Sequence, residues 1–334
     1  MSVKLLKRLR DIARAVVMFF NTPKRRTRIC FNYDRDLFLK HSGALNPDSR
    51  DALLSQVIMA YHVIEKGLTM PNRRLDFGHD ALQNLMKLIS AFEETYGNDK
   101  MVSHGVGVVK AYLKLHRDSN FDFSADLAFW QSIETFSDRH VDVPVAEQLH
   151  LTREDFFANR QAQFPEFAAS RHTCRHFHGI VPIDVIKNAV LLAMTAPSAC
   201  NRQYVKAHCV ADSQLKDAVL SMQHGSRGFG QDADKVILVT AELSGVRWIE
   251  ERNDPFVNAG IFIMNLCYAL HYFKVAHCIL NWSVGRYADR DMHDLLKIPE
   301  KERIAVIIAC GGMPEEVDIA SSPRKFLDDV LVLH

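Results

Sequence analysis

The sequence predicts a mixed helix-and-sheet domain, of the α/β or α+β class, behind a mainly helical region. From residue 160 onward, apolar runs short enough for buried strands alternate with helical segments. Before that point, residues 45–115 carry apolar side chains at the three- and four-residue spacing of amphipathic helices. At 334 residues, the chain is long enough for two folded regions or for one domain with a large extension.

The individual elements follow from apolar spacing and from capping residues. In the first half, we expect helices over residues 48–67, 80–97 and 102–116. Residues 117–150 mix aromatic and acidic residues, and we expect a connector with at most one short helix there. In the second half, we expect helices over 182–196 and 256–273 and strands over 205–211, 235–243, 276–283 and 303–312. The helix at 256–273 is apolar on nearly all sides, which predicts a central, buried element.

The N-terminus has the pattern of a basic amphipathic helix. The first thirty residues hold nine basic residues against one acid, a net charge of +8 in a chain whose total is +1. The segment is too short and too charged for a membrane span or a secretory signal. It either packs on the body of the protein or lies on an anionic membrane face through residues 1–28. The acidic remainder makes nucleic acid an unlikely main partner.

The seven cysteines are scattered and include no C-x-x-C pair. This distribution favours a reducing compartment, which we take as cytoplasmic, and argues against a zinc site. Cys267 and Cys310 lie inside apolar runs and are expected to be small buried residues.

Residues 171–177 could form an anion site. Arg171, Thr173 and Arg175 stand at alternate positions, flanked by His172 and His176. In an extended segment alternate residues share a face, so two guanidiniums and a hydroxyl can approach one anion. Alternating basic residues can also form an ordinary solvated edge.

Two later segments carry further polar groups near turns. Residues 196–203, which follow the helix at 182–196, include Ser198 and Asn201, with donors and acceptors suited to the edge of a heterocycle. A glycine-rich turn at 311–314 is followed by Arg324. Taken singly, residues 196–203 are compatible with an ordinary helix-to-strand turn, and Arg324 is compatible with an ordinary surface arginine.

In order and spacing, these three segments together resemble the nitroreductase family. The matching stretches are RHTCRHF at 171–177, APSACNRQ at 196–203 and GGMP at 311–314 followed by Arg324. The resemblance covers about half of the chain. It implies an α+β, nitroreductase-like FMN-binding fold with a helical N-terminal extension, and a homodimer whose subunits share each active site.

The resemblance also implies roles for particular residues. The FMN phosphate and ribityl chain would be bound by Arg171, His172, Thr173, Arg175 and Arg324. The isoalloxazine ring would be lined by Pro197, Ser198 and Asn201 of the partner subunit, and flavin N5 would lie beside Leu280, Asn281, Trp282 and Ser283. The indole of Trp282 would narrow the face on which the nicotinamide of NAD(P)H stacks. No catalytic side chain and no metal site are predicted.

Two more segments lie near the expected site. Residues 61–78 are similar to the segment that precedes nitroreductase-like domains encoded among polysaccharide-biosynthesis proteins. There, His62, Glu65 and Lys66 are one helical turn apart, and we expect an ion-pair cluster that caps the helix rather than a catalytic group. The glycine-rich residues 222–230 are expected to form a mobile loop over the pocket, with Arg227 able to meet an anionic substrate.

The sequence thus divides into a basic helix and linker at 1–30, a helical region at 31–155 and an FMN-binding domain at 160–334. The expected function is an FMN-dependent oxidoreductase that passes hydride from NAD(P)H to a small organic substrate in two steps. Two alternatives stay open: a flavin-binding oxidase or flavin-consuming enzyme on the same fold, and a non-catalytic module at a membrane or assembly. The expected location is cytoplasmic, with peripheral contact at the inner face of a membrane as an option.

Overall fold

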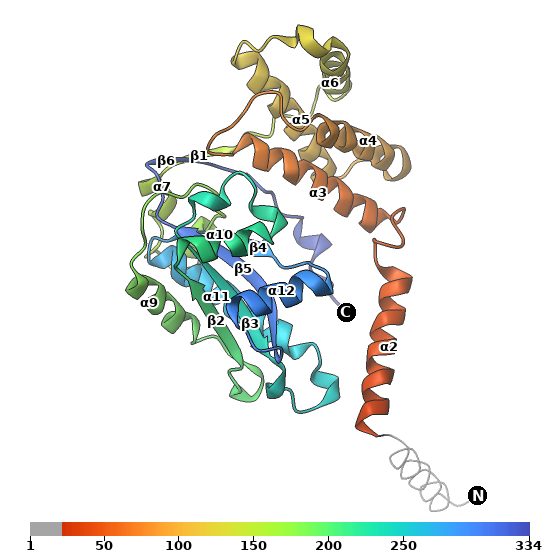
Figure 1. The fold of residues 1–334 in the computed structure, drawn as a ribbon. Helices are drawn as coiled ribbons and strands as arrows, with labels where there is room; N and C mark the ends of the chain where they lie inside the picture. Colours follow the sequence, from red (N-terminus) through yellow and green to blue (C-terminus); the bar gives the residue numbers. More distant parts are fainter. Residues whose placement is uncertain (1–21) are drawn as a thin grey trace, which may run out of the picture.

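The computed structural model describes residues 22–334 (Figure 1). The predicted basic helix at 1–28 lies mostly outside these residues. The first described helix, α2, runs over Pro23–His41 and continues through the expected boundary at residue 30. Within residues 22–334, none of the helices combines the length and apolar character that crossing a membrane requires.

The helical region is a bundle around its own core. It consists of α3 (Arg50–Leu68), α4 (His79–Tyr96), α5 (Lys100–Asp118), the 3-10 turn η1 (Phe123–Asp126) and α6 (Leu127–Arg139). The connector expected at 117–150, with at most one short helix, contains the 13-residue helix α6, which belongs to that core. The apolar side chains of Phe129, Ile133 and Phe136 recur at helical spacing and are buried, as is Trp130.

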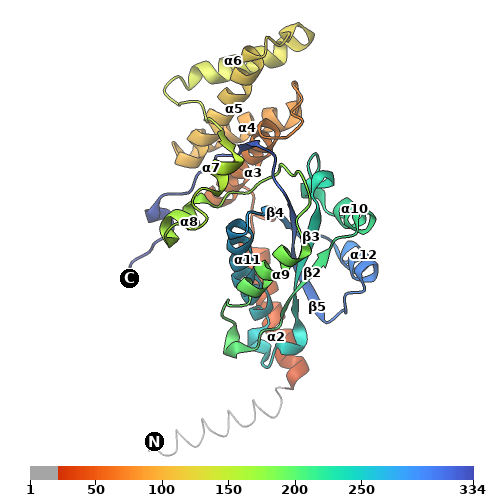
Figure 2. The ribbon, with the colours of Figure 1, turned by 90° about the vertical axis from the view of Figure 1, so that its left-hand side faces the viewer.

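The second half is built on an antiparallel sheet. Its strands are β2 (Val205–Val210), β3 (Lys235–Glu242), β4 (Ala276–Asn281) and β5 (Glu302–Gly311), in the order β2-β3-β5-β4. Helices α9 (Ile183–Ala193) and α11 (Asp254–Tyr272) cover one face, while α10 (Ser213–Ser221) and α12 (Arg286–Leu296) cover the other (Figure 2). Separate apolar cores fill the two faces. The α+β class with a helical N-terminal part is therefore confirmed.

A small second sheet links the two halves. Strand β1 (Leu149–Thr152) follows the helical bundle and pairs antiparallel with β6 (Glu316–Ile319), with Leu149 opposite Ile319. Two short helices, α7 (Arg153–Phe157) and α8 (Phe164–Ser170), then lead into the first predicted motif. Further 3-10 turns are η2 (Ala199–Asn201), η3 (His224–Ser226), η4 (Gly230–Asp232), η5 (Leu243–Gly245), η6 (Ile249–Glu251) and η7 (Leu327–Asp329).

Candidate cofactor site

The strand register puts the first two predicted motifs at opposite ends of the main sheet. The backbone N–H of Cys174 donates to the carbonyl of His277 at the start of β4 (3.0 Å), so residues 171–177 lie at that end. Residues 196–203 lead directly into Val205, at the other end of β2. The five steps from Val205 to Val210 alone span roughly 17 Å. We call these ends the Arg175 end and the Arg202 end.

At the Arg175 end, the first motif is extended and held by its backbone and by one histidine. The Nε2–H of His176 donates to the carbonyl of Thr69, just after α3 (2.7 Å). Cys174 and Phe177 are buried in the core of the sheet domain. The motif is therefore fixed between the sheet and the C-terminal end of α3, which the sequence did not predict.

The two motif arginines have different neighbours. Nη2 of Arg175 lies 3.4 Å from Nε2 of His62 on α3. Arg171 lies near the end of α11 and the start of β4, where its charge adds to the effect of burial on two histidines. Burial, with that charge, lowers the pKa of His271 to about 3 and that of His277 to about 4.

The charge of the late arginine acts on the first motif. Burial lowers the pKa of His172, and the charges of Arg171 and Arg324 lower it further. Arg324 also acts on Tyr61 of α3, whose pKa burial raises. Its guanidinium is exposed and donates to the carbonyl of Ser322 in its own loop.

These cations have no counter-ion in the part of the chain that the structure describes. Within residues 22–334, Lys66, Arg171, Arg175 and Arg324 form no ion pair with any carboxylate, although Arg26, Arg50, Arg117, Arg153, Arg202 and Arg252 each form at least one. The half-buried hydroxyl of Thr173 likewise has no hydrogen-bond partner among those residues. Guanidinium, ammonium and hydroxyl groups without acids form a set of donors that suits a phosphate.

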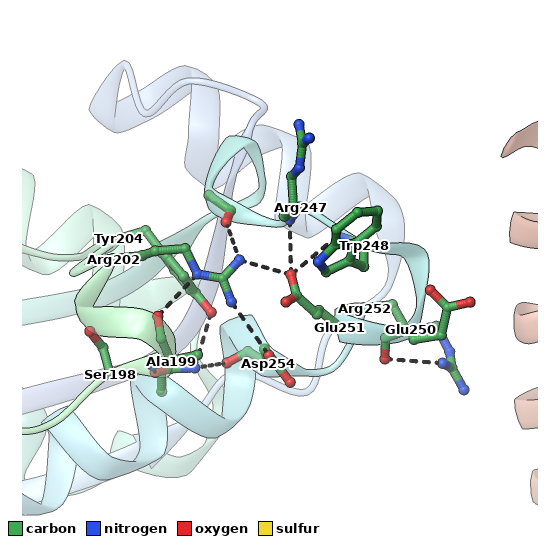
Figure 3. Close-up of polar contacts among 12 residues, drawn as sticks. Ser198, Ala199, Arg202, Tyr204, Arg247, Trp248, Glu250, Glu251, Arg252 and Asp254 are labelled. Carbon is green, nitrogen blue, oxygen red and sulfur yellow. Dashed lines mark hydrogen bonds and ion pairs between the residues drawn. The ribbon is translucent and has the colours of Figure 1, made fainter.

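The Arg202 end is organised around one arginine that has several partners (Figure 3). Arg202 donates to the carbonyls of Ala199 (3.0 Å) and Gly245 (2.8 Å) and to Oε2 of Glu251 (2.8 Å). The same carboxylate accepts from the backbone N–H of Arg247 (2.9 Å). Burial opposes the charge of Glu251, but these contacts outweigh it and lower its pKa to about 2.

The loop clamped by Arg202 has an unusual backbone. Cys200, Asn201 and Gln203 have φ angles of 52°, 54° and 51°, in the left-handed region that side-chain-bearing residues seldom occupy. Additional hydrogen bonds hold them there, including Ala199 N–H to Oδ1 of Asn258 (2.8 Å) and Gln203 N–H to Oγ of Ser198 (3.1 Å). Such over-determined strain is typical of binding sites.

A cavity of about 140 Å³ opens beside this loop, between α9, β2 and α11. Pro197 and Ser198 line it together with apolar residues such as Phe262. Asn201, the third residue expected at the flavin ring, does not line it, and its Oδ1 accepts from Nε2 of Gln203 (2.9 Å).

The residues expected beside flavin N5 lie on both faces of the sheet, because successive side chains along β4 point in opposite directions. Leu280 and Trp282 are buried in the core, and the indole Nε1–H donates to Asp289 of α12 (2.9 Å). The expectation that this indole narrows a ligand face is therefore wrong, since it packs inward. Asn281 is exposed on the other side, and its Nδ2 donates to Oγ of Ser283 (2.7 Å).

The glycine-rich loop is anchored rather than free. The side chain of Gln223 donates to the carbonyl of Asn281 (3.0 Å) and accepts from the N–H of Gly225 (2.7 Å). Phe229 is fully buried. His224, Arg227 and Gly228 are exposed between these anchored residues, so the expected mobile lid reduces to short exposed stretches.

The main feature missed at the sequence level is the contribution of α3. The expected cluster of His62 and Glu65 exists, and it extends to His104 of α5, whose Nε2 lies 2.8 Å from Oε1 of Glu65. Lys66, however, stays outside it and lies near Arg175 instead. The i and i+4 spacing of His62 and Lys66 could have suggested a shared face, but nothing local to α3 pointed to residue 175.

Comparison with known proteins returned matches among solved structures only: no protein-family model and no curated protein matched the chain. Many of these structures belong to the nitroreductase family. A nitroreductase-family protein from Streptococcus pneumoniae is 18% identical, with 52% of this chain and 100% of that one covered, at a TM-score of 0.45. An FMN-dependent nitroreductase from Clostridium difficile is 21% identical over 49% of this chain and 92% of its own, at a TM-score of 0.39. At such identities and scores, these likenesses assign neither an activity nor a cofactor.

Proposed function

We propose that this chain binds FMN and works as an oxidoreductase of the nitroreductase type. The observation that carries the proposal is the group of cations at the Arg175 end, which has no carboxylate among the described residues to neutralise it. Mutually repelling, partly buried cations cost stability unless an anion binds between them. Among phosphate-bearing ligands, we infer FMN because the three motifs resemble those of the nitroreductase family in order and spacing.

The residues present fit this cofactor. Arg175 and Arg171 would bind and neutralise the phosphate, Arg324 would close over it from the C-terminal loop, and the Thr173 hydroxyl would donate one more hydrogen bond. FMN, when bound, supplies the hydride chemistry. The protein then needs no nucleophile, and its work is to place the ring, to exclude water and to admit NAD(P)H and a small organic substrate in turn.

We propose that a second copy of the chain completes the site in a homodimer. The two motifs lie at opposite ends of the sheet, so both can contact one flavin only if a partner brings its Arg202 end to the Arg175 end of the first copy. An exposed apolar surface on α9 and α11 is available for this contact. It comprises Ile183, Leu191, Leu192 and Met194 at α9, and Phe256, Val257, Ile261 and Met264 on α11.

The test is the colour of the purified protein. We expect flavin absorbance that persists through gel filtration, a dimeric mass, and bleaching on addition of NADH or NADPH under exclusion of oxygen. A colourless protein that takes up no added FMN would refute the proposal. With Trp282 turned into the core, no observation favours the oxidase or flavin-consuming alternative over this one.

A second candidate role concerns α2. None of its residues is buried, and Ile29, Phe31, Tyr33, Leu37, Phe38 and Leu39 are exposed. This helix is held to the sheet domain by ion pairs of Arg26 with Glu250 and of Asp34 with Arg252. We infer that residues 1–28 and α2 provide peripheral contact with a membrane from the cytoplasmic side. Binding to anionic liposomes that is lost on deletion of residues 1–28 would support this, and equal binding to neutral liposomes would contradict it.

A further inference from the structure

The last turns of α3 are part of the Arg175 end, although they belong to the helical region. The 2.7 Å bond from His176 to the carbonyl of Thr69 fixes the end of α3 against the first motif. One to two turns earlier, Nε2 of His62 lies 3.4 Å from Nη2 of Arg175. A guanidinium can only donate, so this nitrogen of His62 is an acceptor and carries no proton.

The acid on this stretch of α3, Glu65, already has partners. It is fully buried between His104 (2.8 Å) and His62 (3.5 Å), and Oγ of Ser321 donates to its Oε1 (3.4 Å), while its Oε2 has no hydrogen-bond partner among the described residues. His62 thus lies between Glu65, on its Nδ1 side, and Arg175, on its Nε2 side. It is a positioning residue that aligns Arg175.

Lys66 follows His62 by one helical turn, so both side chains leave α3 on the same face. It is half-buried, and within residues 22–334 no carboxylate pairs with it. Burial lowers its pKa, and the charge of Arg175 lowers it further. Two cations from separate regions thus approach each other without an acid between them.

We propose that Lys66 is a phosphate ligand, contributed by the helical region to the same anion that Arg175 binds. The inference rests on the proposed FMN function and deepens it. On this assignment, the helical bundle forms one wall of the cofactor site, because an α3 side chain would contact the ligand. The ligand class is a phosphomonoester at the end of a flavin side chain.

A competing explanation is that Lys66 serves only its helix, since cations in the last turn interact favourably with the helix dipole. The two explanations predict opposite changes in the Tm of the flavin-free protein. If Lys66 serves the helix, Lys66→Met lowers the Tm of the flavin-free protein and leaves flavin affinity unchanged. If it serves the ligand, the same change relieves repulsion, keeps or raises that Tm, and weakens binding of the phosphate-bearing flavin.

The experiment compares FMN with riboflavin, which lacks the phosphate, by flavin fluorescence on the full-length protein. We expect Lys66→Met to weaken FMN binding about 10- to 100-fold and to leave riboflavin binding unchanged. Lys66→Arg should retain most of the FMN affinity. The control, Lys87→Met at an exposed position on α4, should change neither ligand.

Unchanged FMN affinity in Lys66→Met, or equal loss for both flavins, would overturn the assignment while leaving the FMN function standing. A wild-type protein that binds no FMN would instead refute the function itself, and the assignment with it, before any variant is made. If Lys66→Met does not fold, Lys66→Gln carries the same expectation.

Discussion

The two ends of the main sheet use arginine in opposite ways. At the Arg202 end, Arg202 donates to two carbonyls and a carboxylate of its own chain, and it fixes a strained loop. At the Arg175 end, Arg175 meets only a histidine, and neither it nor Arg324 reaches an acid within residues 22–334. An arginine whose partners are all in the chain acts as scaffold, whereas one without an acid is available to a ligand.

The largest expected effect separates these two uses by substitution. Arg175→Met should weaken FMN binding by about 100-fold or more, since a charge-assisted contact to the phosphate is lost, while riboflavin binding changes little. Arg202→Met should lower the Tm by several degrees and keep the ratio of FMN to riboflavin affinity. Titration of both flavins and thermal unfolding of the flavin-free variants provide the measurements. An equal change in the ratio of FMN to riboflavin affinity in both variants would contradict the distinction between the two arginines.

The second prediction tests whether the two ends meet across a dimer. Val257→Glu places a charge in the exposed apolar face of α11 and should shift the protein to monomer, with loss of bound flavin. Analytical ultracentrifugation and flavin absorbance report the two effects. Val141→Glu, at a more exposed apolar position in the helical region, serves as the control. Flavin retained by a monomeric Val257→Glu protein would show that one chain holds a complete site.

The third prediction concerns pH and the histidines near Arg171. The pKa values of His271 and His277, about 3 and 4 in the folded protein, lie below the unfolded value of about 6.5. At pH values between the folded and the unfolded pKa, the unfolded chain binds more protons than the folded protein. The free energy of unfolding therefore declines as pH falls from about 6.5 towards 4. His271→Leu should reduce this slope by up to about 1.4 kcal/mol per pH unit. Unfolding across that pH range checks it, with exposed His224→Leu expected to follow the wild type.

The smallest effect concerns the strained loop. Cys200 is exposed at a φ of 52°, where glycine has no steric penalty. Cys200→Gly should therefore stabilise the flavin-free protein by up to about 1 kcal/mol. The larger conformational entropy that glycine loses on folding reduces this gain. Denaturant unfolding measures the change, and Cys209→Gly, on strand β2, should destabilise instead. Destabilisation by Cys200→Gly would argue that the loop is not strained.

Much of the fold could be predicted because its elements carry local signals. The helix expected at 256–273 is α11 at Asp254–Tyr272, and the strand expected at 303–312 is β5 at Glu302–Gly311. The expected burial of that helix on nearly all sides is wrong, because Phe256, Val257 and Ile261 are exposed. For α6, the sequence predicted at most one short helix, because its aromatic residues were interpreted as loop composition instead of as one helical face. Short polar helices such as α12 also escaped, since most of their surface is exposed and their apolar period is brief.

The site was predictable only in part. The order of the motifs along the chain predicted the arginines at 171, 175 and 324 as phosphate ligands, and this role stays a prediction. The place of Lys66 was not, because it depends on how two regions more than 100 residues apart pack together. The inward turn of Trp282 likewise follows from which face of β4 is covered by α12, and strand alternation alone leaves that choice open.

The pairing of β1 with β6 makes the helical region inseparable from the C-terminal half. A chain truncated to start at residue 160 would leave β6 without its only partner strand among the described residues, and the loop that carries Arg324 would begin from an unanchored edge. The four-residue ladder therefore connects the bundle to the segment that leads into Arg324, and we expect substitutions within β1 to alter how that arginine is positioned.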